Sequence, residues 1–329
     1  MLASGLDRVG GPEVLTLREV AEPTMQADAL KVAVAIAGVN YQDVYYRNGT
    51  YSATLPLLLG DDGMGTVLEV GSEVSGFSVG DRVAWTGAQA SYAQIAVVPA
   101  RTTSRLPDDL PDEAGLLLAQ GLTAHYLAHD TAALQHGDTT LVHAAAGGVG
   151  SLLTRVLRIR GVRVIGVVSS ASKVQAARQA GASEVIVSSE ADFAEAVLTL
   201  TGGRGVDVVF DGVGKPTFAQ GLKCLRRRGT MVLYGASGGD VENFNPRALA
   251  AAGSISLIRP RLKDYLATRA EFEARVKALF DWVRQGQVDI TIGCTFELSA
   301  AARAHQMLES RQAIGKLILR IPRASSVHS

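Results

Sequence analysis

The pattern of apolar and polar positions changes along the chain. Up to about residue 110, short β-branched runs bounded by Gly and Pro predict strands, and helical periodicity is scarce. These strands are predicted at 30–37, 65–70, 81–85 and 92–98. From Leu116 to about Leu257, apolar strand-like runs alternate with helical segments, which predicts a doubly wound parallel sheet with helices between the strands.

The boundaries of the two patterns indicate two domains. A first helix is predicted to start at Pro111, and the strands of the parallel sheet are predicted at 139–142, 163–168, 184–187, 207–210, 230–234 and 254–258. A long helix is predicted at 263–285, followed by a strand, a helix and a strand at 291–296, 301–308 and 316–319. We expect this tail to complete the first domain, so that residues 1–116 and 262–329 form one domain and 117–261 the other. Ala324–Ser329 are expected to fray.

Composition narrows the class of protein. Of the 329 residues, 47% are hydrophobic, and 32 basic residues balance 32 acidic ones. This balance argues against nucleic acid or an anionic membrane as the main partner. No apolar run reaches the length of a membrane span, and the N-terminus lacks the apolar core of a signal peptide. Two cysteines, Cys224 and Cys294, make no disulfide framework, which favours a cytoplasmic location.

The most informative motif is the run from His143 to Gly150, which lies between a predicted strand and a predicted helix (151–160). In this context the motif residues Gly147, Gly148, Val149 and Gly150 predict a dinucleotide site. Gly147 lets the backbone approach a pyrophosphate, Gly150 lets the helix pack on the sheet, and the helix N-terminus attracts the anion. Because Ala145 replaces the first glycine of the usual motif, a glycine-rich turn in another α/β fold stays the alternative.

The end of the next predicted strand bears on the choice of dinucleotide. NAD sites usually carry an acidic residue there, whereas this chain has Ser169, Ser170 and Lys173. Hydroxyls and an ammonium group suit a 2′-phosphate, so the sequence favours NADPH. With Ser170 or Ser172 as the N-cap, Lys173 lies in a first helical turn, where a cation opposes the helix dipole unless a phosphate is bound. The alternative is a solvated surface lysine.

Several motifs in this order resemble the zinc-independent quinone oxidoreductases of the medium-chain dehydrogenase/reductase superfamily. They are residues 10–15, 40–51, 80–83, 144–150, 227–229 and 309–311, and the resemblance spans nearly the whole chain. It implies a GroES-like β-rich catalytic domain and a Rossmann NADPH-binding domain, with the active site in the cleft between them. It also implies a homodimer, for which the predicted edge strand 254–259 is apolar enough to pair with its copy.

The resemblance also implies that no metal takes part. Zinc alcohol dehydrogenases of the same superfamily bind catalytic zinc through Cys, His and a third Cys or Asp. Here Asn40 stands at the position that resembles the first Cys, and Asp61 and Asp62 stand where the relatives have His-Glu. Catalytic zinc needs about three protein ligands, which this chain lacks at those positions. Asp62 is expected to pair with a cation or with backbone N–H groups, and an oxygen-ligand pair for a divalent ion is the remote alternative.

Without a metal, hydrogen-bond donors must stabilise the charge that develops on the substrate. We expect hydride transfer to a quinone or a conjugated enone. The catalytic candidates are Tyr45, which donates to the oxyanion, Asn40, which shapes the pocket, and Tyr51, which is the alternative donor. Either tyrosine also fits as an aromatic wall. His143, at the end of a buried strand, is expected to be structural.

By resemblance, further residues contact the cofactor. Gln42 and Asp43 would lie near the nicotinamide ribose and amide, and Thr123 would face the nicotinamide. The remaining contacts would come from Gly212, Gly214, Gly235, Ala236, Ser237, Arg259 and Arg311. The chain departs from the family at Ser188, in place of a tyrosine near the adenine, and at Gln120, in place of a lysine.

Two rival functions stay open at the sequence level. An enoyl-thioester or alkenal reductase of the same superfamily would reduce a C=C bond and would need a proton donor. A non-catalytic NADPH-binding protein would bind the cofactor without turnover, although the intact segment 40–51 argues against it.

Overall fold

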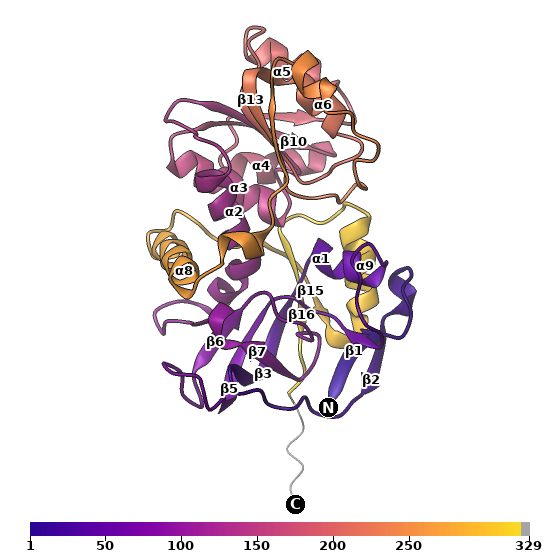
Figure 1. Cartoon of the computed structure of the whole chain (residues 1–329), viewed down its shortest axis with the longest axis vertical. Coiled ribbons are helices and arrows are strands. Elements are labelled where there is room, and N and C mark those ends of the chain that lie inside the picture. The colour runs from indigo at the N-terminus through magenta and orange to yellow at the C-terminus, as the bar shows by residue number, and fades with distance from the viewer. Residues whose placement is uncertain (324–329) are drawn as a thin grey trace, which may run out of the picture. The chain divides into compact units, whose positions relative to one another are not determined.

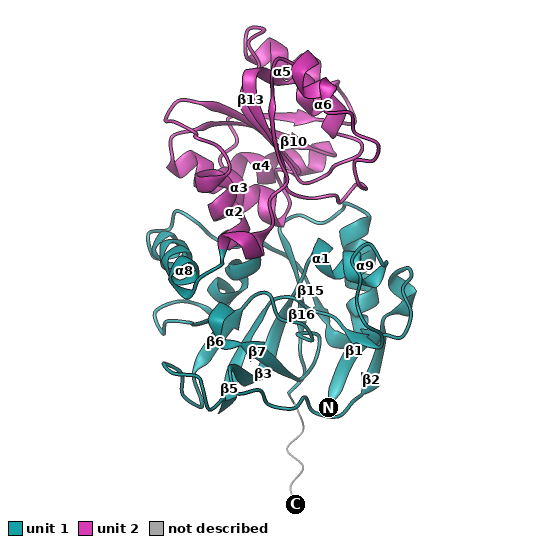
Figure 2. Cartoon of the chain, viewed as in Figure 1, with its two compact units in different colours: residues 1–119, 266–329 teal, residues 120–265 magenta. Residues whose placement is uncertain are grey.

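The computed structural model describes residues 1–323, and the predicted fraying of Ala324–Ser329 lies outside this range. The chain forms two compact units, one of residues 1–119 with the segment after 265 and one of residues 120–265 (Figure 2). The predicted boundaries, after residues 116 and 261, lie three and four residues before these. Within residues 1–323, no helix combines the length and the apolar character needed to cross a bilayer.

Unit 1 is rich in β-structure. Its seven-stranded sheet has the order β15-β16-β3-β5-β6-β8, with β7 paired to β3, and a three-stranded sheet has the order β2-β1-β4 (Figure 1). The strands are β1 (Leu2–Leu6), β2 (Thr16–Glu19), β3 (Ala29–Val39), β4 (Leu57–Leu58), β5 (Gly63–Val70), β6 (Arg82–Trp85), β7 (Ile95–Pro99), β8 (Thr103–Arg105), β15 (Ile292–Glu297) and β16 (Lys316–Arg320). The helices are α1 (Tyr41–Arg47), α8 (Arg269–Arg284) and α9 (Ala301–Glu309).

The C-terminal tail completes unit 1, as the sequence predicts. Strand β16 pairs with β3 in antiparallel register, Leu317 facing Val39, and β15 pairs with β16 in parallel. The apolar side chains of these strands share one buried cluster with Trp85 and Tyr92. The last strands therefore stand directly beside β3, whose end leads into α1.

Unit 2 is the doubly wound domain. Its six-stranded parallel sheet has the order β11-β10-β9-β12-β13-β14. The strands are β9 (Thr139–His143), β10 (Arg163–Val168), β11 (Glu184–Val187), β12 (Val206–Asp211), β13 (Leu225–Leu233) and β14 (Ser256–Ile258). The helices are α2 (Leu118–Asp130), which begins two residues before the unit, α3 (Gly148–Ile159), α4 (Val174–Gln179), α5 (Phe193–Leu200), α6 (Phe218–Lys223) and α7 (Arg247–Ala251). The strand order reverses between β9 and β12, and ligands of such sheets bind at the carboxyl ends of the strands next to this point.

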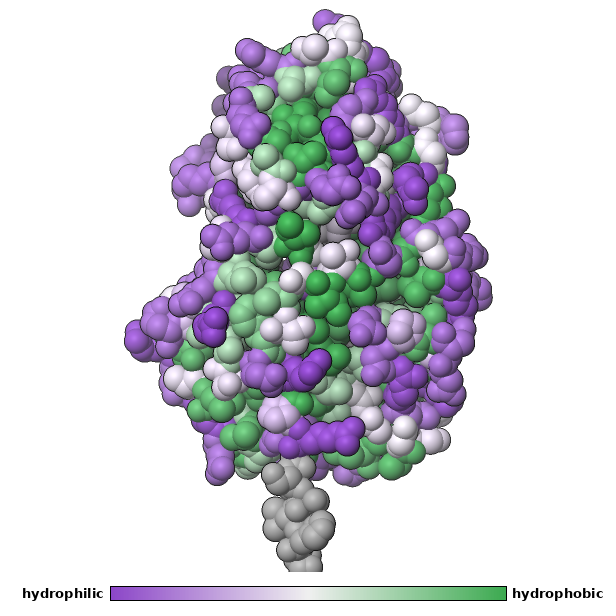
Figure 3. Space-filling view, turned by 180° about the vertical axis from the view of Figure 1, so that it is seen from behind, coloured by the Kyte–Doolittle hydropathy of each residue, from purple (hydrophilic) through white to green (hydrophobic). Residues whose placement is uncertain are grey.

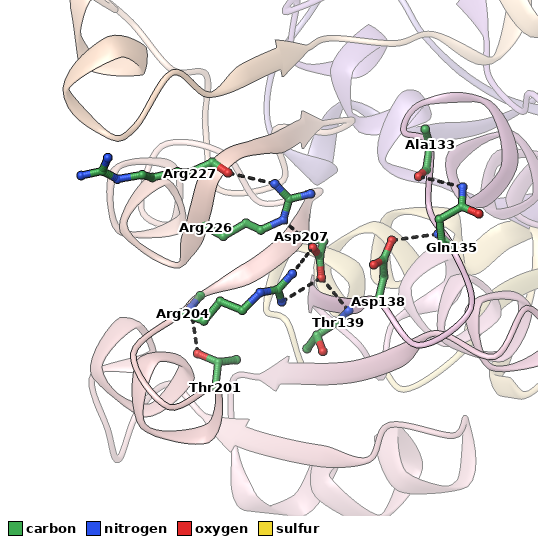
Figure 4. Close-up of polar contacts among 10 residues, drawn as sticks. Ala133, Gln135, Asp138, Thr139, Thr201, Arg204, Asp207, Arg226 and Arg227 are labelled. Atoms are coloured by element: carbon green, nitrogen blue, oxygen red, sulfur yellow. Dashed lines mark hydrogen bonds and ion pairs between the residues drawn. The ribbon is translucent and has the colours of Figure 1, made fainter.

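The amino ends of three strands in this sheet are joined by Asp207 (Figure 4). Its buried carboxylate accepts the backbone N–H of Thr139 at 2.9 Å and the guanidinium groups of Arg204 at 2.6 Å and Arg226 at 2.5 Å. Burial alone would raise the pKa of Asp207, but these donors together hold it below its usual value. The charged network thus lies at the amino ends of the strands, whereas the cofactor site is predicted at their carboxyl ends.

The structure corrects several element predictions. The strand-rich interpretation of the first 110 residues missed the short helix α1. The helix predicted from Pro111 is a 3₁₀ helix at Asp112–Leu117 that leads into α2. The helix predicted at 263–285 is a 3₁₀ turn followed by α8, because Thr268 and Glu271 form a capping box that starts the helix afresh. The helix predicted at 151–160 begins earlier, at Gly148.

Candidate functional site

The glycine turn lies at the carboxyl end of β9. Ala144 has a left-handed backbone with φ of 52°, and the N–H of Gly147 donates to its carbonyl at 2.8 Å. A Cβ on Gly150 would overlap that same carbonyl oxygen, so α3 reaches its position only with glycine there. Gly147 has room for no more than a tight contact, since a Cβ would stand 3.2 Å from the Ala144 oxygen. The first N–H groups of α3 have no carbonyl within the helix, which suits the turn to a pyrophosphate.

Gln120 on α2 covers this turn. A Cβ on Gly148 would overlap the Gln120 side chain, so the two residues are in close contact. Sequence reasoning treated Gln120 only as a departure from the family, whereas the structure places it on the glycine cradle. Thr123 lies one helical turn further along α2 and is partly buried.

Ser169, Ser170 and Lys173 follow the end of β10, as predicted. Ser170 is the N-cap of a 3₁₀ turn at Ala171–Lys173, as predicted, but neither Ser170 nor Ser172 makes a capping hydrogen bond through its side chain in the described contacts. Instead their hydroxyl groups pair at 2.9 Å across a short 3₁₀ turn, and Lys173 precedes α4. The two hydroxyls and the ammonium group still lie together after the same strand, with no carboxylate among residues 169–173.

The loops after β12 and β13 are bonded to each other. The N–H of Ser237 donates to the carbonyl of Gly212 at 3.1 Å, and a Cβ on Gly235 would stand 2.6 Å from that oxygen. Ala236 lies between Gly235 and Ser237 in the sequence. Gly214 has a φ of 92°, and Arg259, just after β14, donates to the carbonyl of Leu233 at 3.2 Å.

Asp211 shapes the first of these loops and was not predicted. Its buried carboxylate accepts the N–H groups of Val213 at 2.7 Å and Gly214 at 3.1 Å, and the hydroxyl of Thr217 at 2.8 Å. An acidic residue that ends a strand before Gly-x-Gly is the sequence signal for such a loop. The predicted glycine turn, serines, glycine loops and Arg259 thus all follow carboxyl ends of strands in one sheet. Arg311 lies in unit 1, after α9, with a φ of 57°.

His143 is buried at the end of β9 and packs edge-on against Phe193, with ring centroids 4.9 Å apart. Burial lowers the pKa of its imidazole. This placement agrees with the structural role predicted from the sequence.

In unit 1, α1 carries the predicted catalytic segment. The rings of Tyr45 and Tyr51 are 5.1 Å apart, Tyr46 and Tyr51 are 5.5 Å apart, and Tyr41 lies 6.2 Å from Tyr45. The N–H of Tyr51 donates to the carbonyl of Tyr45 at 2.9 Å, which folds the loop back onto the helix. Tyr51 is 37% exposed, so the aromatic cluster reaches the surface of the unit.

Asp62 pairs with a buried cation and is held by Asn40. The Nζ of Lys316 lies 2.7 Å from Asp62, both side chains are 1% exposed, and the Asn40 amide donates to Asp62 at 2.6 Å. The prediction that Asp62 pairs with a cation is confirmed. Sequence reasoning missed Lys316, which is 254 residues away along the chain.

Asp43 is enclosed at the start of α1. Its side chain is 2% exposed and accepts the N–H groups of Asn40 at 2.9 Å and Gly60 at 3.1 Å. It forms a capping box with Asn40 at the start of α1. Burial, and after it the charge of Asp61, raises the pKa of Asp43 to about 8. A carboxyl group enclosed in this way positions α1, and a contact of Asp43 with the cofactor stays a prediction.

Asp61 is partly buried beside α1. One carboxylate oxygen accepts the amide of Gln42 at 2.7 Å, and the other accepts the hydroxyl of Thr86 at 3.1 Å. Burial first, and then the charge of Asp62, raises the pKa of Asp61 to about 6. Gln42 is exposed, so the hydrogen-bonded pair of Gln42 and Asp61 lies at the surface of unit 1. Across residues 1–323, no three His, Cys, Asp or Glu side chains are placed to hold a metal ion together.

Comparison with known proteins gives two family matches. Residues 26–108 match the alcohol dehydrogenase GroES-like domain, and residues 148–282 match a domain described as zinc-binding dehydrogenase. These matches confirm the predicted fold class of a GroES-like β-rich domain with a Rossmann domain.

Relatives match over nearly the full length. A quinone oxidoreductase of Pseudomonas aeruginosa is 40% identical over 94% of this chain and 96% of its own length. A 2-haloacrylate reductase of a Burkholderia species is 36% identical over 98% and 100%. The solved structure of Escherichia coli quinone oxidoreductase with NADPH has a TM-score of 0.95 at 34% identity, covering 97% of this chain and 100% of that one. A mycobacterial protein solved with NADPH has a TM-score of 0.95 at 41% identity, with the same coverage.

Proposed function

The chain belongs to the quinone oxidoreductase family of the medium-chain dehydrogenase/reductase superfamily, and on that premise we propose that it is an NADPH-dependent quinone reductase. The observation that carries the proposal is the glycine turn at the point where the strand order of unit 2 reverses, which needs glycine at 150 because a Cβ there would overlap the Ala144 carbonyl oxygen. Solved relatives contain NADPH, which supports the choice of cofactor.

We assign cofactor binding to unit 2, residues 120–265. When bound, NADPH supplies the hydride from its nicotinamide ring. Gly147, Gly148, Val149 and Gly150 would hold the pyrophosphate at the N-terminus of α3, with Gln120 at its side. Ser169, Ser170 and Lys173 would hold the 2′-phosphate. The remaining contacts would come from Thr123, Gly212, Gly214, Gly235, Ala236, Ser237 and Arg259, and from Gln42 and Arg311 of unit 1.

We assign the acceptor to the aromatic cluster of unit 1. Tyr45 would donate a hydrogen bond to the acceptor oxygen, Tyr51 would stack on its ring, and Asn40, fixed by Asp62, would shape the pocket. No step of this scheme needs a metal, because the hydroxyl donor and charge delocalisation in a quinone stabilise the developing oxyanion. The Tyr45→Phe variant tests the donor, and Tyr51→Phe is its matched control, because only a donor role makes Tyr45 more sensitive to loss of the hydroxyl.

A second candidate function is reduction of a C=C bond in an enone, alkenal or enoyl thioester. The full-length similarity to a 2-haloacrylate reductase and the acidic Asp61 beside α1 favour it. Such a reaction needs a proton on carbon as well as a hydride.

The deciding experiment is oxidation of NADPH and NADH by the purified protein with quinones, enones and a crotonyl thioester. Faster turnover of quinones with NADPH supports the main proposal, and faster turnover of the enone or thioester supports the second. Tight NADPH binding with no turnover of any acceptor contradicts both and leaves a non-catalytic binding protein.

We further propose a homodimer through β14. This strand lies at the edge of the sheet, Leu257 and Ile258 are partly exposed, and Figure 3 shows apolar side chains gathered on one face of unit 2. Pairing two copies would remove the free edge. Light scattering should give twice the mass of one chain, and the mass of one chain would contradict the proposal.

We also propose a cytoplasmic location. Both cysteines are free, and Cys224 is buried at the end of α6, as expected in a reducing compartment. Cell fractionation tests it, and recovery of the protein outside the cytoplasm would refute it.

A further inference from the structure

Three acidic side chains lie together in unit 1 around α1. Asp43, Asp61 and Asp62 influence one another electrostatically, and the buried cation among them is Lys316. The three differ in exposure and in the chemistry of their partners, and these differences decide which of them exchanges a proton with a bound molecule.

The Asp62 oxygen that faces Lys316 is fixed as an acceptor. One oxygen faces the ammonium group of Lys316 at 2.7 Å and the other faces the amide of Asn40 at 2.6 Å. An ammonium group only donates hydrogen bonds, so a proton on that oxygen of Asp62 would have no partner to accept it. The side chain is also fully enclosed.

Asp43 is enclosed in a similar way. Two backbone N–H groups point at it, and the hydroxyl of Tyr92 lies 3.3 Å away. With 2% of the residue exposed, the carboxyl group is out of reach of a bound acceptor. Its role is to hold the first turn of α1.

Asp61 differs from both. It is partly exposed, and its two side-chain partners can each reverse direction. The hydroxyl of Thr86 donates or accepts, and the amide of Gln42 presents either its NH₂ or its oxygen after a half turn. Asp61 therefore has hydrogen-bond partners both as a carboxylate and as a carboxylic acid, although the donating hydroxyl of Thr86 and the N–H of Gly87 favour the charged form.

The charged and titratable groups around Asp61 are defined. Asp62 lies on the same loop, Asp43 and Tyr46 face it from α1, and Lys316 faces it from β16. Burial and the negative charge of Asp62 favour the protonated form of Asp61. The positive charge of Lys316 and the hydrogen bonds from Thr86 and Gly87 favour its carboxylate. The balance leaves the pKa of Asp61 at about 6, close to the range in which general acids work.

We propose that Asp61 is the catalytic proton donor that completes reduction of the acceptor. The acceptor gains a hydride, with its electron pair, from the nicotinamide of NADPH, and NADPH is oxidised to NADP⁺. The Asp61 O–H bond breaks as a new bond forms from that proton to the enolate carbon of an enone or to the oxygen of a quinol anion. The resulting carboxylate regains a proton from water, so the sum is NADPH, acceptor and H⁺ giving NADP⁺ and the reduced acceptor.

This inference rests on the proposed function and names the acceptors that depend on Asp61 most. Protonation of carbon needs a positioned acid more than protonation of a quinol oxygen, which water also serves. We therefore expect the Asp61→Asn variant to lose about 100-fold in kcat with an enone, the size of a typical general-acid contribution, and less with a quinone.

The pH profile gives the sharper test. In the native protein kcat for an enone should fall as pH rises through the pKa of Asp61 in the loaded enzyme, because only the acid donates. Asp61→Asn should remove this limb. Thr86→Val should move it to higher pH, because the lost hydroxyl stabilises the carboxylate. Asp109→Asn removes a carboxylate of unit 1 that pairs with Arg284, and it should leave the limb in place.

A measurement without cofactor or acceptor accompanies the kinetics. The ¹³C chemical shift of the Asp61 carboxyl group, assigned by its absence from Asp61→Asn, should titrate near pH 6 and move upward in Thr86→Val. A native-like limb in Asp61→Asn, or an unmoved titration in Thr86→Val, would overturn the proposal. Failure of the native protein to turn over any acceptor refutes the proposed function instead, which separates the two failures.

Discussion

The regions assigned to the cofactor and to the acceptor are built by different means. At the strand ends of unit 2 the shape comes from the backbone: a left-handed Ala144, glycines that leave no room for a Cβ, and loops bonded to each other. Around α1 in unit 1 it comes from the ionisable side chains of Asp43, Asp61 and Asp62, the last of which pairs with Lys316. Changes at the glycine turn should therefore act through sterics and be insensitive to pH, whereas changes around α1 should act through charge.

The largest effect is expected from Lys316→Met. It removes the partner of Asp62 and leaves a buried carboxylate, which typically destabilises a protein by about 3–5 kcal/mol. Urea unfolding at pH 7 measures it. Adding Asp62→Asn to Lys316→Met should restore part of the stability, and a single variant as stable as the native protein would show that unit 1 does not depend on this pair.

The second-largest effect is expected from Gly150→Val, which changes the shape of the glycine turn and no charge. The new side chain overlaps the Ala144 carbonyl, and overpacking typically costs about 1–3 kcal/mol. If the glycine turn takes up this strain, the Kd for NADPH rises roughly ten- to hundredfold, which fluorescence titration measures. Gly202→Ala is the control, since it strains a residue of positive φ in open space away from the carboxyl ends of the strands and should leave the Kd unchanged.

The pH dependence of stability should separate the two regions further. The pKa of Asp43 is raised to about 8 and that of Asp61 to about 6, so the folded protein holds protons that the unfolded chain has released. Their contribution to stability is complete below about pH 4 and declines as pH rises towards 8, with a slope of at most about 1.4 kcal/mol per pH unit for each proton. Urea unfolding at several pH values should show this decline, and a smaller one in Asp43→Asn. An equal decline in both proteins would place the effect elsewhere.

The smallest effect is expected from Lys173→Met. The loss of one partly exposed contact to a phosphate weakens NADPH binding by about 1 kcal/mol, or roughly fivefold. NADH lacks the 2′-phosphate, so its affinity should change little. Parallel titrations with both cofactors test this, and equal losses for the two would remove Lys173 from the 2′-phosphate site.

The same contrast explains what could be predicted from the sequence. The turn at 144–150 and the strand ends after it follow from local patterns, because glycine and strand signals act within a few residues. Lys316 could not be found in this way, since it meets Asp62 across 254 residues and only the pairing of β16 with β3 brings them together. Helix α1 is only seven residues long, too short for a periodic signal, although Asn40 and Asp43 have the spacing of a capping box. Burial of Asp43 likewise depends on Gly60 and Tyr92, which lie far from it in sequence.

The position of Lys316 in β16 has a consequence for synthesis of the chain. A ribosome releases residues 120–265, a continuous unit, before it has made the strand that carries this lysine. During that interval the acids around α1 have no ammonium partner, and β3 lacks its neighbour β16. The nascent protein can thus fold its nucleotide-binding unit before unit 1 has received its last strands, and unit 1 completes its folding last.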